Sequence, residues 1–157
     1  DLRGNWGWYL VGAIDMASML LPRNTLITST RYKLYPQERY ESQWDDVIWY
    51  RPIVVLVDGL TASASEVMAW ALKFHKNAIL VWSKTFWKWS IQTINDFGDW
   101  SSIKYTIWKR DLPDWSNIDW VWIKPDVEVE FDEELYSKKW IDNQLEKAKE
   151  IISSKIK

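Results

Sequence analysis

The sequence predicts an α/β fold, and two short apolar runs with a helical segment between them carry this prediction. The first run, residues 53–57, is continuous, as in a strand that is buried on both faces of a parallel sheet. Residues 61–76 place apolar side chains at helical spacing, and residues 78–81 form the second apolar run. A strand, a helix and a second parallel strand make one βαβ unit, which is right-handed in nearly all proteins.

The segments before this unit predict a helix, a strand and a long excursion. Apolar residues in the segment 9–21 recur at helical spacing, and Pro22 ends the pattern because proline cannot continue a helix. Residues 25–30 are rich in side chains that favour strands. Residues 31–51 are polar and aromatic without a clear period, so we expect an irregular excursion there.

The segments after the unit predict a hairpin, a further strand and a helix. Residues 90–95 and 103–108 flank a turn around Gly98, which is typical of a hairpin. Residues 126–131 alternate acidic and apolar side chains, as in a strand with one solvated face. Residues 133–156 are charged and amphipathic, so we expect one helix at the C-terminus.

The bulk composition fits one domain and excludes several partners. The chain has 157 residues, enough for a single core. Its 20 basic and 22 acidic side chains leave a net charge of -2, so neither nucleic acid nor an anionic membrane is expected as a partner. The sequence contains no cysteine for a disulfide and no run of about 18 apolar residues. Because it begins with Asp1, we expect a fragment or a processed product.

The connection between the first predicted strand and its helix, residues 58–66, gathers small hydroxyl residues at a helix N-terminus. Unpaired amides and the helix dipole favour negative charge at such a position. A serine there is suited to act as a nucleophile whose tetrahedral intermediate is stabilised by neighbouring amides. Ser63 with Glu66 three residues later is also the pattern of a capping box, which is the simpler interpretation of these residues alone.

Four blocks of sequence, in this order and spacing, resemble the C-terminal processing (tail-specific) serine peptidases. They read "DLRGNWGWYL", "VVLVDGLTASASEVMAWAL", "KTFWKWSIQT" and "IDWVWIKPDVEV". The family pattern runs LR-x-N-x-G-G, a buried strand, S/T-A-S-A-S-E, T-F-G-K-G-x-x-Q-T and G-x-G-I-x-P-D. The resemblance covers about the first 130 residues. It implies an α/β fold of the ClpP/crotonase type, built from stacked βαβ and ββα units and incomplete here at the N-terminus.

The resemblance also implies the site residues. Ser63 corresponds to the nucleophile of the family, and Lys88, 25 positions later, corresponds to the general base. Gln92 corresponds to the glutamine that supports the lysine, and the backbone amides of Ala64 and Gly7 are expected to form the oxyanion hole. A free lysine, with a pKa of about 10.4, is protonated at neutral pH, so the base must be buried to lose its charge. A serine–lysine pair needs no histidine, metal or cofactor.

Two other sets of titratable residues are expected to be structural. His75 lies near the end of the predicted helix, where a partly exposed imidazole suits the helix dipole. Four acidic residues alternate along the predicted strand near the C-terminus, which favours a solvated face over a metal site: Asp126, Glu128, Glu130 and Asp132.

For the whole protein, the resemblance implies a serine endopeptidase that cleaves proteins with apolar C-terminal tails, near or from those tails. It implies a periplasmic, cell-envelope or secreted location and an upstream PDZ domain that this chain lacks. Residues 1–131 would be the C-terminal part of the catalytic core, and residues 132–157 an amphipathic helix. Assembly into a homo-oligomer is left open. Two alternatives from other classes are an inactive scaffold or regulatory protein with the peptidase fold, and an aromatic-rich carbohydrate-binding module.

Tryptophan stands where the family has glycine. The chain has 14 tryptophans and 5 glycines. The positions at which the family usually has glycine are Trp8, Trp70, Trp82, Trp87, Trp89, Trp115, Trp120 and Trp122. Those at which glycine is common or fits the local turn are Trp6, Trp100 and Trp108. A single cause explains such a uniform exchange, and our hypothesis is a UGA codon that the host reads as glycine and that is translated here as tryptophan. The sequence leaves Trp44, Trp49 and Trp140 unassigned, and the chain as written is expected to be weakly active or inactive.

Overall fold

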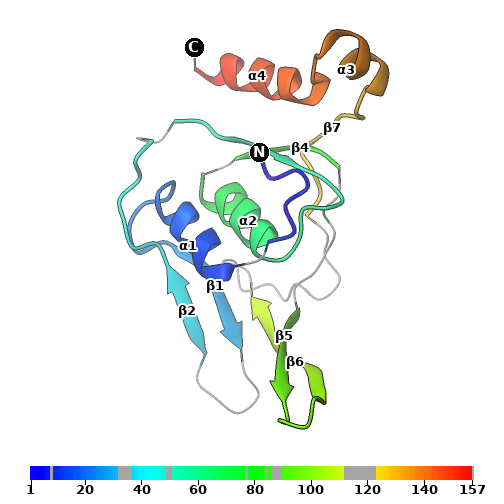
Figure 1. The fold of residues 1–157 in the computed structure, drawn as a ribbon. Helices are drawn as coiled ribbons and strands as arrows, with labels where there is room; N and C mark the ends of the chain where they lie inside the picture. Colours follow the sequence, from blue (N-terminus) through cyan, green and yellow to red (C-terminus); the bar gives the residue numbers. More distant parts are fainter. Residues whose placement is uncertain are drawn as a thin grey trace.

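The computed structural model describes residues 1–7, 9–31, 37–48, 51–76, 78–83, 85, 90–111 and 123–156. These residues form two sheets with helices packed around them (Figure 1). In chain order the elements are α1 (Leu10–Ser18), β1 (Leu26–Arg31), β2 (Glu38–Glu41), β3 (Val54–Val57), α2 (Ala64–Lys76), β4 (Ile79–Trp82), β5 (Ser90–Asp96), β6 (Ser102–Asp111), β7 (Val127–Glu128), α3 (Glu133–Lys139) and α4 (Asn143–Lys155).

The three-stranded sheet contains the predicted βαβ unit. Its strand order is β3-β4-β7 and both pairs are parallel, with Val54 opposite Ile79 in the first pair. Helix α2 connects β3 to β4, so the prediction of two parallel strands joined by a helix is confirmed. Side chains alternate along β3, because Val55 and Val57 belong to the main core whereas Leu56 faces α4. Burial on both faces explains why this strand is apolar at every position.

The second sheet is antiparallel, with the strand order β2-β1-β6-β5. The predicted hairpin is present as β5 and β6, which pair from Ser90 opposite Lys109 to Asp96 opposite Ser102. Strand β2 lies within the segment predicted to be irregular, and that part of the prediction is wrong. Its residues are exposed or half-buried, so they carry no apolar run or alternation that marks a strand.

Helices α1 and α2 pack side by side in the centre of the molecule (Figure 1). The buried side chains that join them and cover one face of the parallel sheet include Ala13, Ile14, Ala17, Leu21, Val67, Ala71 and Leu72. Helix α1 ends at Ser18, before the predicted boundary, although Leu21 still belongs to the core. No helix in the described part of the chain is long and apolar enough to span a bilayer.

The C-terminal segment forms two helices, so the prediction of one helix over residues 133–156 is wrong. Helix α3 ends at Lys139 and is capped by Trp140, whose φ of 57° lies in the left-handed region. Helix α4 begins after Asp142, whose side chain accepts from two amides of the first turn of α4. A left-handed residue at this position terminates a helix. Helix α4 then covers the outer face of the parallel sheet, where Ala148 and Ile151 pack near Leu56.

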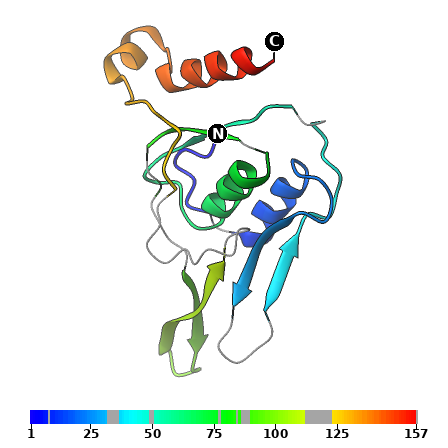
Figure 2. The same cartoon turned by 180° about the vertical axis from the view of Figure 1, so that it is seen from behind.

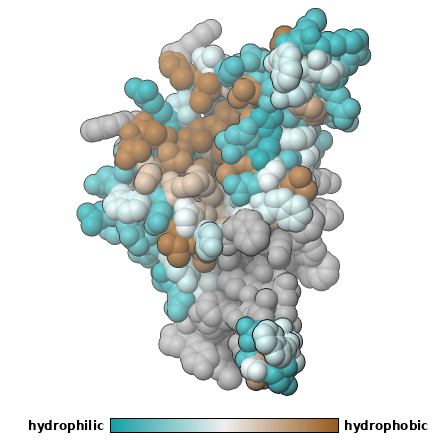
Figure 3. Space-filling view, in the orientation of Figure 1, coloured by the Kyte–Doolittle hydropathy of each residue, from teal (hydrophilic) through white to brown (hydrophobic). Residues whose placement is uncertain are grey.

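Figure 2 shows α3 and α4 at one end of the molecule, opposite the strands of the antiparallel sheet. In the view of Figure 3, apolar side chains of the surface gather between α4 and α1. Strand β3 lies at the edge of its sheet. The amphipathic helix α4 therefore borders an apolar face of the molecule.

Three tryptophans occupy backbone conformations that favour glycine. The described residues other than glycine with positive φ are Asn24, Ser63, Trp82, Trp100 and Trp140. A bulky residue is rare in this region because its Cβ crowds the backbone. Trp82 and Trp100 are positions at which the sequence comparison with the family already suggests glycine, and the backbone at Trp140 adds a position that the sequence leaves unassigned. These conformations support the hypothesis that the host inserts glycine.

We predict that Trp140→Gly stabilises the 157-residue chain by about 1 kcal/mol. Glycine adopts the left-handed conformation without the roughly 1–2 kcal/mol that tryptophan loses there, and this gain exceeds the entropic cost of roughly 0.5–1 kcal/mol for a glycine. The ring of Trp140 is 80% exposed, so little packing is lost. Trp44→Gly is the matched control, because Trp44 is also exposed but is not among the residues with positive φ. Urea unfolding of both variants measures the difference, and equal effects would contradict the prediction.

We also predict that the protein isolated from its native host contains glycine at positions 100 and 140. Mass spectrometry of peptides that cover these positions is the measurement, together with sequencing of the gene. UGA codons and glycine masses are expected. UGG codons at these positions would end the hypothesis.

Candidate active site

Ser63 lies in the turn between β3 and α2, immediately before the first residue of the helix. Its φ of 55° places a non-glycine residue in the left-handed region. Such a conformation costs roughly 1–2 kcal/mol and is concentrated at functional sites. Ser63 is half-buried, and its carbonyl oxygen accepts from Val67 N at 3.1 Å, which begins the helix.

Glu66 forms one half of the predicted capping box. Its Oε2 accepts a hydrogen bond from Ser63 N at 2.8 Å. A normal N-cap residue has an extended backbone, whereas Ser63 is left-handed. The carboxylate of Glu66 therefore holds the serine in a strained turn, an arrangement that differs from ordinary capping.

The same carboxylate connects the serine turn to the segment that carries the predicted lysine. Oε1 of Glu66 accepts from Thr85 Oγ1 at 2.5 Å, and both side chains are buried. Thr85 precedes Lys88 by three residues, but Lys88 lies outside the described residues. Gln92 is on β5 opposite Thr106, and the structure describes its backbone only.

The loop of residues 4–7 lies directly against the serine turn. Gly7 has a φ of 69°, and a Cβ at this position would lie 2.1 Å from Ala62 O and 2.5 Å from Ala64 N. The amide of Ala64 is in the first turn of α2, where the helix itself supplies no acceptor. The two backbone groups predicted to form the oxyanion hole, at Ala64 and Gly7, are therefore neighbours in space.

Asn5 organises this contact, and the sequence analysis did not identify it. Its carbonyl oxygen accepts from Ala62 N at 3.0 Å, and its Oδ1 accepts from Ser65 Oγ at 2.8 Å and from Gly7 N at 3.0 Å. The amide of Gly7 thus has an acceptor in this structure. A side-chain oxygen that accepts from the amide two residues later is typical of asparagine in a turn, so the N-x-G pattern was a usable signal.

Asp58 binds both backbone segments that meet at the site, the loop of residues 4–7 and the turn before Ser63. Its carboxylate accepts from Gly4 N at 2.9 and 3.1 Å, from Leu60 N at 2.9 Å and from Thr61 N at 2.8 Å. Asp58 is therefore a turn residue. It also ties the loop of residues 4–7 to the end of β3.

The titratable residues that the sequence assigns to structural roles have structural partners where the structure describes them. His75 is at the opposite end of α2 from Ser63, about 18 Å along the helix axis, and its Nε2 is 2.6 Å from Leu26 O. Asp126 pairs with Lys73 at 2.7 Å, and Asp132 caps α3. Within the described ranges, no group of three or more histidine, aspartate or glutamate side chains is arranged to hold a metal ion.

A strained serine between a strand and a helix of an α/β fold is typical of serine hydrolases. The profile of peptidase family S41 matches residues 1–129. The chain belongs to this family, which confirms the resemblance found in the sequence.

Proteins similar to this chain include C-terminal processing proteases from bacteria. The carboxyl-terminal-processing protease of Synechocystis sp. is 38% identical over 130 residues, which are 83% of this chain and 30% of that protein. The carboxy-terminal processing protease CtpA of Bacillus subtilis is 35% identical over 135 residues, 83% of this chain and 28% of that protein. The chain thus spans less than a third of the length of these two relatives.

Solved structures show the same fold. The photosystem II D1 C-terminal processing protease superposes with a TM-score of 0.74 at 32% identity, over 83% of this chain and 33% of that one. A putative S41 protease from Bacteroides fragilis superposes with a TM-score of 0.81 over 98% of this chain and 44% of its own, at 20% identity. The predicted α/β fold is therefore confirmed, and the second structure extends the likeness across the C-terminal helices.

We predict that Gly7→Ala disrupts the site, whereas Gly4→Ala does not. Both glycines have positive φ, but a Cβ at Gly4 has no atom within 4 Å, whereas a Cβ at Gly7 overlaps three backbone atoms. We expect a loss of about 1 kcal/mol in unfolding free energy for Gly4→Ala and roughly 3 kcal/mol for Gly7→Ala. Urea unfolding gives both values. Equal losses would show that the contact with the serine turn is looser than the distances indicate.

Proposed function

We propose that the chain is part of a serine endopeptidase that processes the C-terminal tails of proteins. The observation that carries the proposal is the left-handed Ser63 at the N-terminus of α2, in contact with the Gly7 loop. Membership of peptidase family S41 and the C-terminal processing proteases among its relatives support the reaction class.

In the proposed mechanism, neutral Lys88 takes the proton of Ser63 Oγ as this oxygen attacks the scissile carbonyl. The amides of Ala64 and Gly7 stabilise the oxyanion of the tetrahedral intermediate. Protonated Lys88 then donates the proton to the leaving amine, and an acyl-enzyme remains. A water molecule, deprotonated by Lys88, hydrolyses this ester and regenerates the serine. Gln92 supports the lysine.

The oxyanion hole requires one rearrangement. Gly7 N donates to Asn5 Oδ1 at 3.0 Å, so this hydrogen bond must be exchanged for one to the substrate. Catalytic hydrogen bonds commonly tighten only when a substrate is bound. The proposal therefore assigns Asn5 Oδ1 to hold the Gly7 amide in place until then.

The proposed substrates are proteins with apolar C-terminal tails, cleaved without a cofactor or metal. One relative is named for processing the D1 protein of photosystem II at its C-terminus, which is a reaction of this kind. Relatives include bacterial and chloroplast proteins, and we propose an exported location, in the periplasm, the cell envelope or outside the cell. Residues 1–131 would belong to the catalytic core and residues 132–157 would follow it. Substrate tails would be recognised by a PDZ domain.

We predict that Ser63→Ala and Lys88→Ala each lower kcat/KM for a tailed protein substrate by at least about 1,000-fold. The complete protein, with glycine at the family's glycine positions, should be used. His75→Gln is the control and should leave hydrolysis nearly unchanged, because His75 lies at the far end of α2. Digestion of a tailed substrate, followed by mass spectrometry of the products, is the measurement. Unchanged biological activity in Ser63→Ala would favour a scaffold that keeps the peptidase fold.

A further inference from the structure

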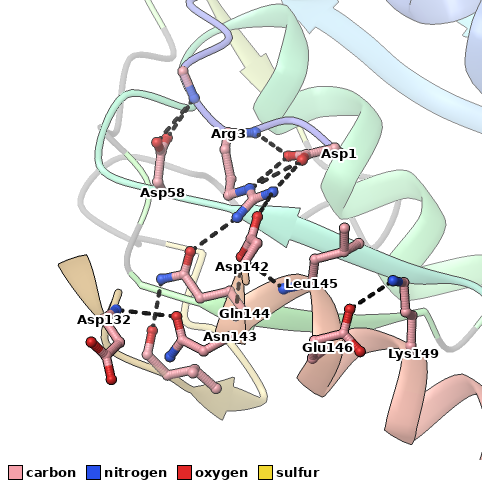
Figure 4. A network of polar contacts seen from close by, with 12 residues as sticks. Asp1, Arg3, Asp58, Asp132, Asp142, Asn143, Gln144, Leu145, Glu146 and Lys149 are labelled. Carbon is pink, nitrogen blue, oxygen red and sulfur yellow. Dashed lines mark hydrogen bonds and ion pairs between the residues drawn. The ribbon is translucent and has the colours of Figure 1, made fainter. Parts of the chain in front are cut away.

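A network of polar contacts joins the C-terminal helix α4 to the N-terminal loop, and Arg3 is its centre (Figure 4). Nη2 of Arg3 lies 2.7 Å from Asp142 Oδ2, and Nη1 donates to Gln144 Oε1 at 3.0 Å. The carboxylate of Asp1 accepts from the same guanidinium at 2.6 to 3.1 Å. The side chain of Arg3 is 17% exposed, so these contacts are shielded better than those of a typical surface ion pair.

Both partners of Arg3 on α4 are held in place by bonds of their own. Asp142 uses Oδ1 to accept from Gln144 N at 3.1 Å and from Leu145 N at 3.0 Å, which leaves Oδ2 for Arg3. The side chain of Gln144 is fully buried, and its Nε2 donates to Val129 O at 3.0 Å. The guanidinium therefore meets a preformed pair of acceptors, which suits the fixed geometry of an arginine fork.

The backbone after Arg3 leads to the serine turn, because both of the next two residues form hydrogen bonds to the segment that precedes Ser63. The next residue, Gly4, donates its amide to Asp58, and Asn5 O accepts from Ala62 N at 3.0 Å. Ala62 directly precedes Ser63. Two hydrogen-bonded contacts and the short backbone segments 3–5 and 62–63 thus connect α4 to the candidate nucleophile.

We propose that Arg3 is a positioning residue of the active site, and that Asp142, which caps α4, and Gln144 of α4 hold the loop of residues 4–7 against the Ser63 turn. This inference rests on the proposed function. It gives the segment beyond residue 129, where the family match ends, a role in shaping the oxyanion hole. The alternative is that α4 only covers apolar surface through Ala148 and Ile151, in which case loss of the ion pair leaves the loop unchanged.

The ion pair is intact at neutral pH. The hydrogen bond from Arg3 is the main cause that lowers the pKa of the Asp142 carboxyl below its ordinary value, against the opposing effect of burial. Because this pKa is lowered on folding, the stabilisation is present above the ordinary aspartate range and is lost as the pH falls through the lowered value. The contact thus persists at any pH at which a lysine can act as a base.

The decisive variant is Asp142→Asn, with Asp132→Asn as the matched control. Asparagine caps a helix as well as aspartate does, so Asp142→Asn keeps the start of α4 and removes only the charge that faces Arg3. Asp132 caps α3 by accepting from Leu135 N at 2.8 Å, so the control makes the same change at a neighbouring helix. Arg3→Lys is a second variant, which keeps the charge but loses the fork.

Amide hydrogen exchange in the complete protein reports on the loop without any need for catalysis. The probes are the amides of Gly4, Gly7 and Ala62, which donate to Asp58 and Asn5. We expect them to exchange about tenfold faster in Asp142→Asn and in Arg3→Lys, and at the unchanged rate in Asp132→Asn. The amide of Leu145, inside the cap of α4, should keep its rate in every variant. The double variant should exchange no faster than the faster single one, because both break one contact.

Hydrolysis supplies the second measurement. We expect kcat to fall about tenfold in Asp142→Asn and Arg3→Lys with little change in KM, because an oxyanion hole acts on the transition state. Loop amides that exchange at the same rate in Asp142→Asn as in Asp132→Asn would overturn the inference. Faster loop exchange in a protein that hydrolyses nothing would support the positioning role of Arg3 and refute the proposed peptidase activity.

Discussion

The contact between the loop of residues 4–7 and the turn at Ser63 is the constraint on which the candidate site depends. There is no room for a Cβ at Gly7, because the carbonyl oxygen of Ala62 would lie 2.1 Å away. Neither segment belongs to a regular element, so hydrogen bonds between them hold both in place, at Asp58 at one end and at Asn5 in the middle. Two parts of the chain that are more than fifty residues apart are thereby fixed relative to each other through their backbones. The electrostatics of an oxyanion hole require this kind of fixed backbone, so that substrate binding needs to displace only the Asn5 side-chain oxygen from the Gly7 amide.

The elements that the sequence predicted well are those whose burial leaves a simple pattern. Strands β3 and β4 are covered on both faces, by α2 and by α4, and so are apolar at successive positions. Strand β2 is exposed or half-buried along its length and, among the described strands, pairs with β1, so its side chains carry no pattern that marks a strand. The break between α3 and α4 was hidden for another reason. A glycine at position 140 followed by Asp142 would have marked a helix end and a new start, and tryptophan at that position removed the signal.

The candidate site likewise has some features that follow from the local sequence and others that depend on the tertiary fold. The strand-to-helix connection located Ser63 and the adjacent amides, because a helix N-terminus follows from local sequence. The hydrogen bond between Glu66 and Thr85, which are 19 residues apart, follows only from how β4 and its continuation pack against α2. Glu66 looked like a simple capping residue for this reason, although its second oxygen reaches the segment before Lys88. The position of Arg3 between two residues of α4 is likewise a product of the tertiary fold, since the partners are 139 and 141 positions away in the sequence.

The role assigned to Arg3 does not depend on which residue occupies position 82. In this chain the guanidinium lies 5.7 Å from the centre of the Trp82 ring, close enough for a cation–π contact. Trp82 has a φ of 116°, so a glycine there would relieve strain and remove that contact. The ion pair with Asp142 and the hydrogen bond to Gln144 would remain, because both acceptors are fixed by α4 itself and not by the ring. The polar contacts of Arg3 therefore support the loop of residues 4–7 whether position 82 is tryptophan or glycine. The cation–π contact requires tryptophan at position 82, whereas the polar contacts of Arg3 do not involve this residue.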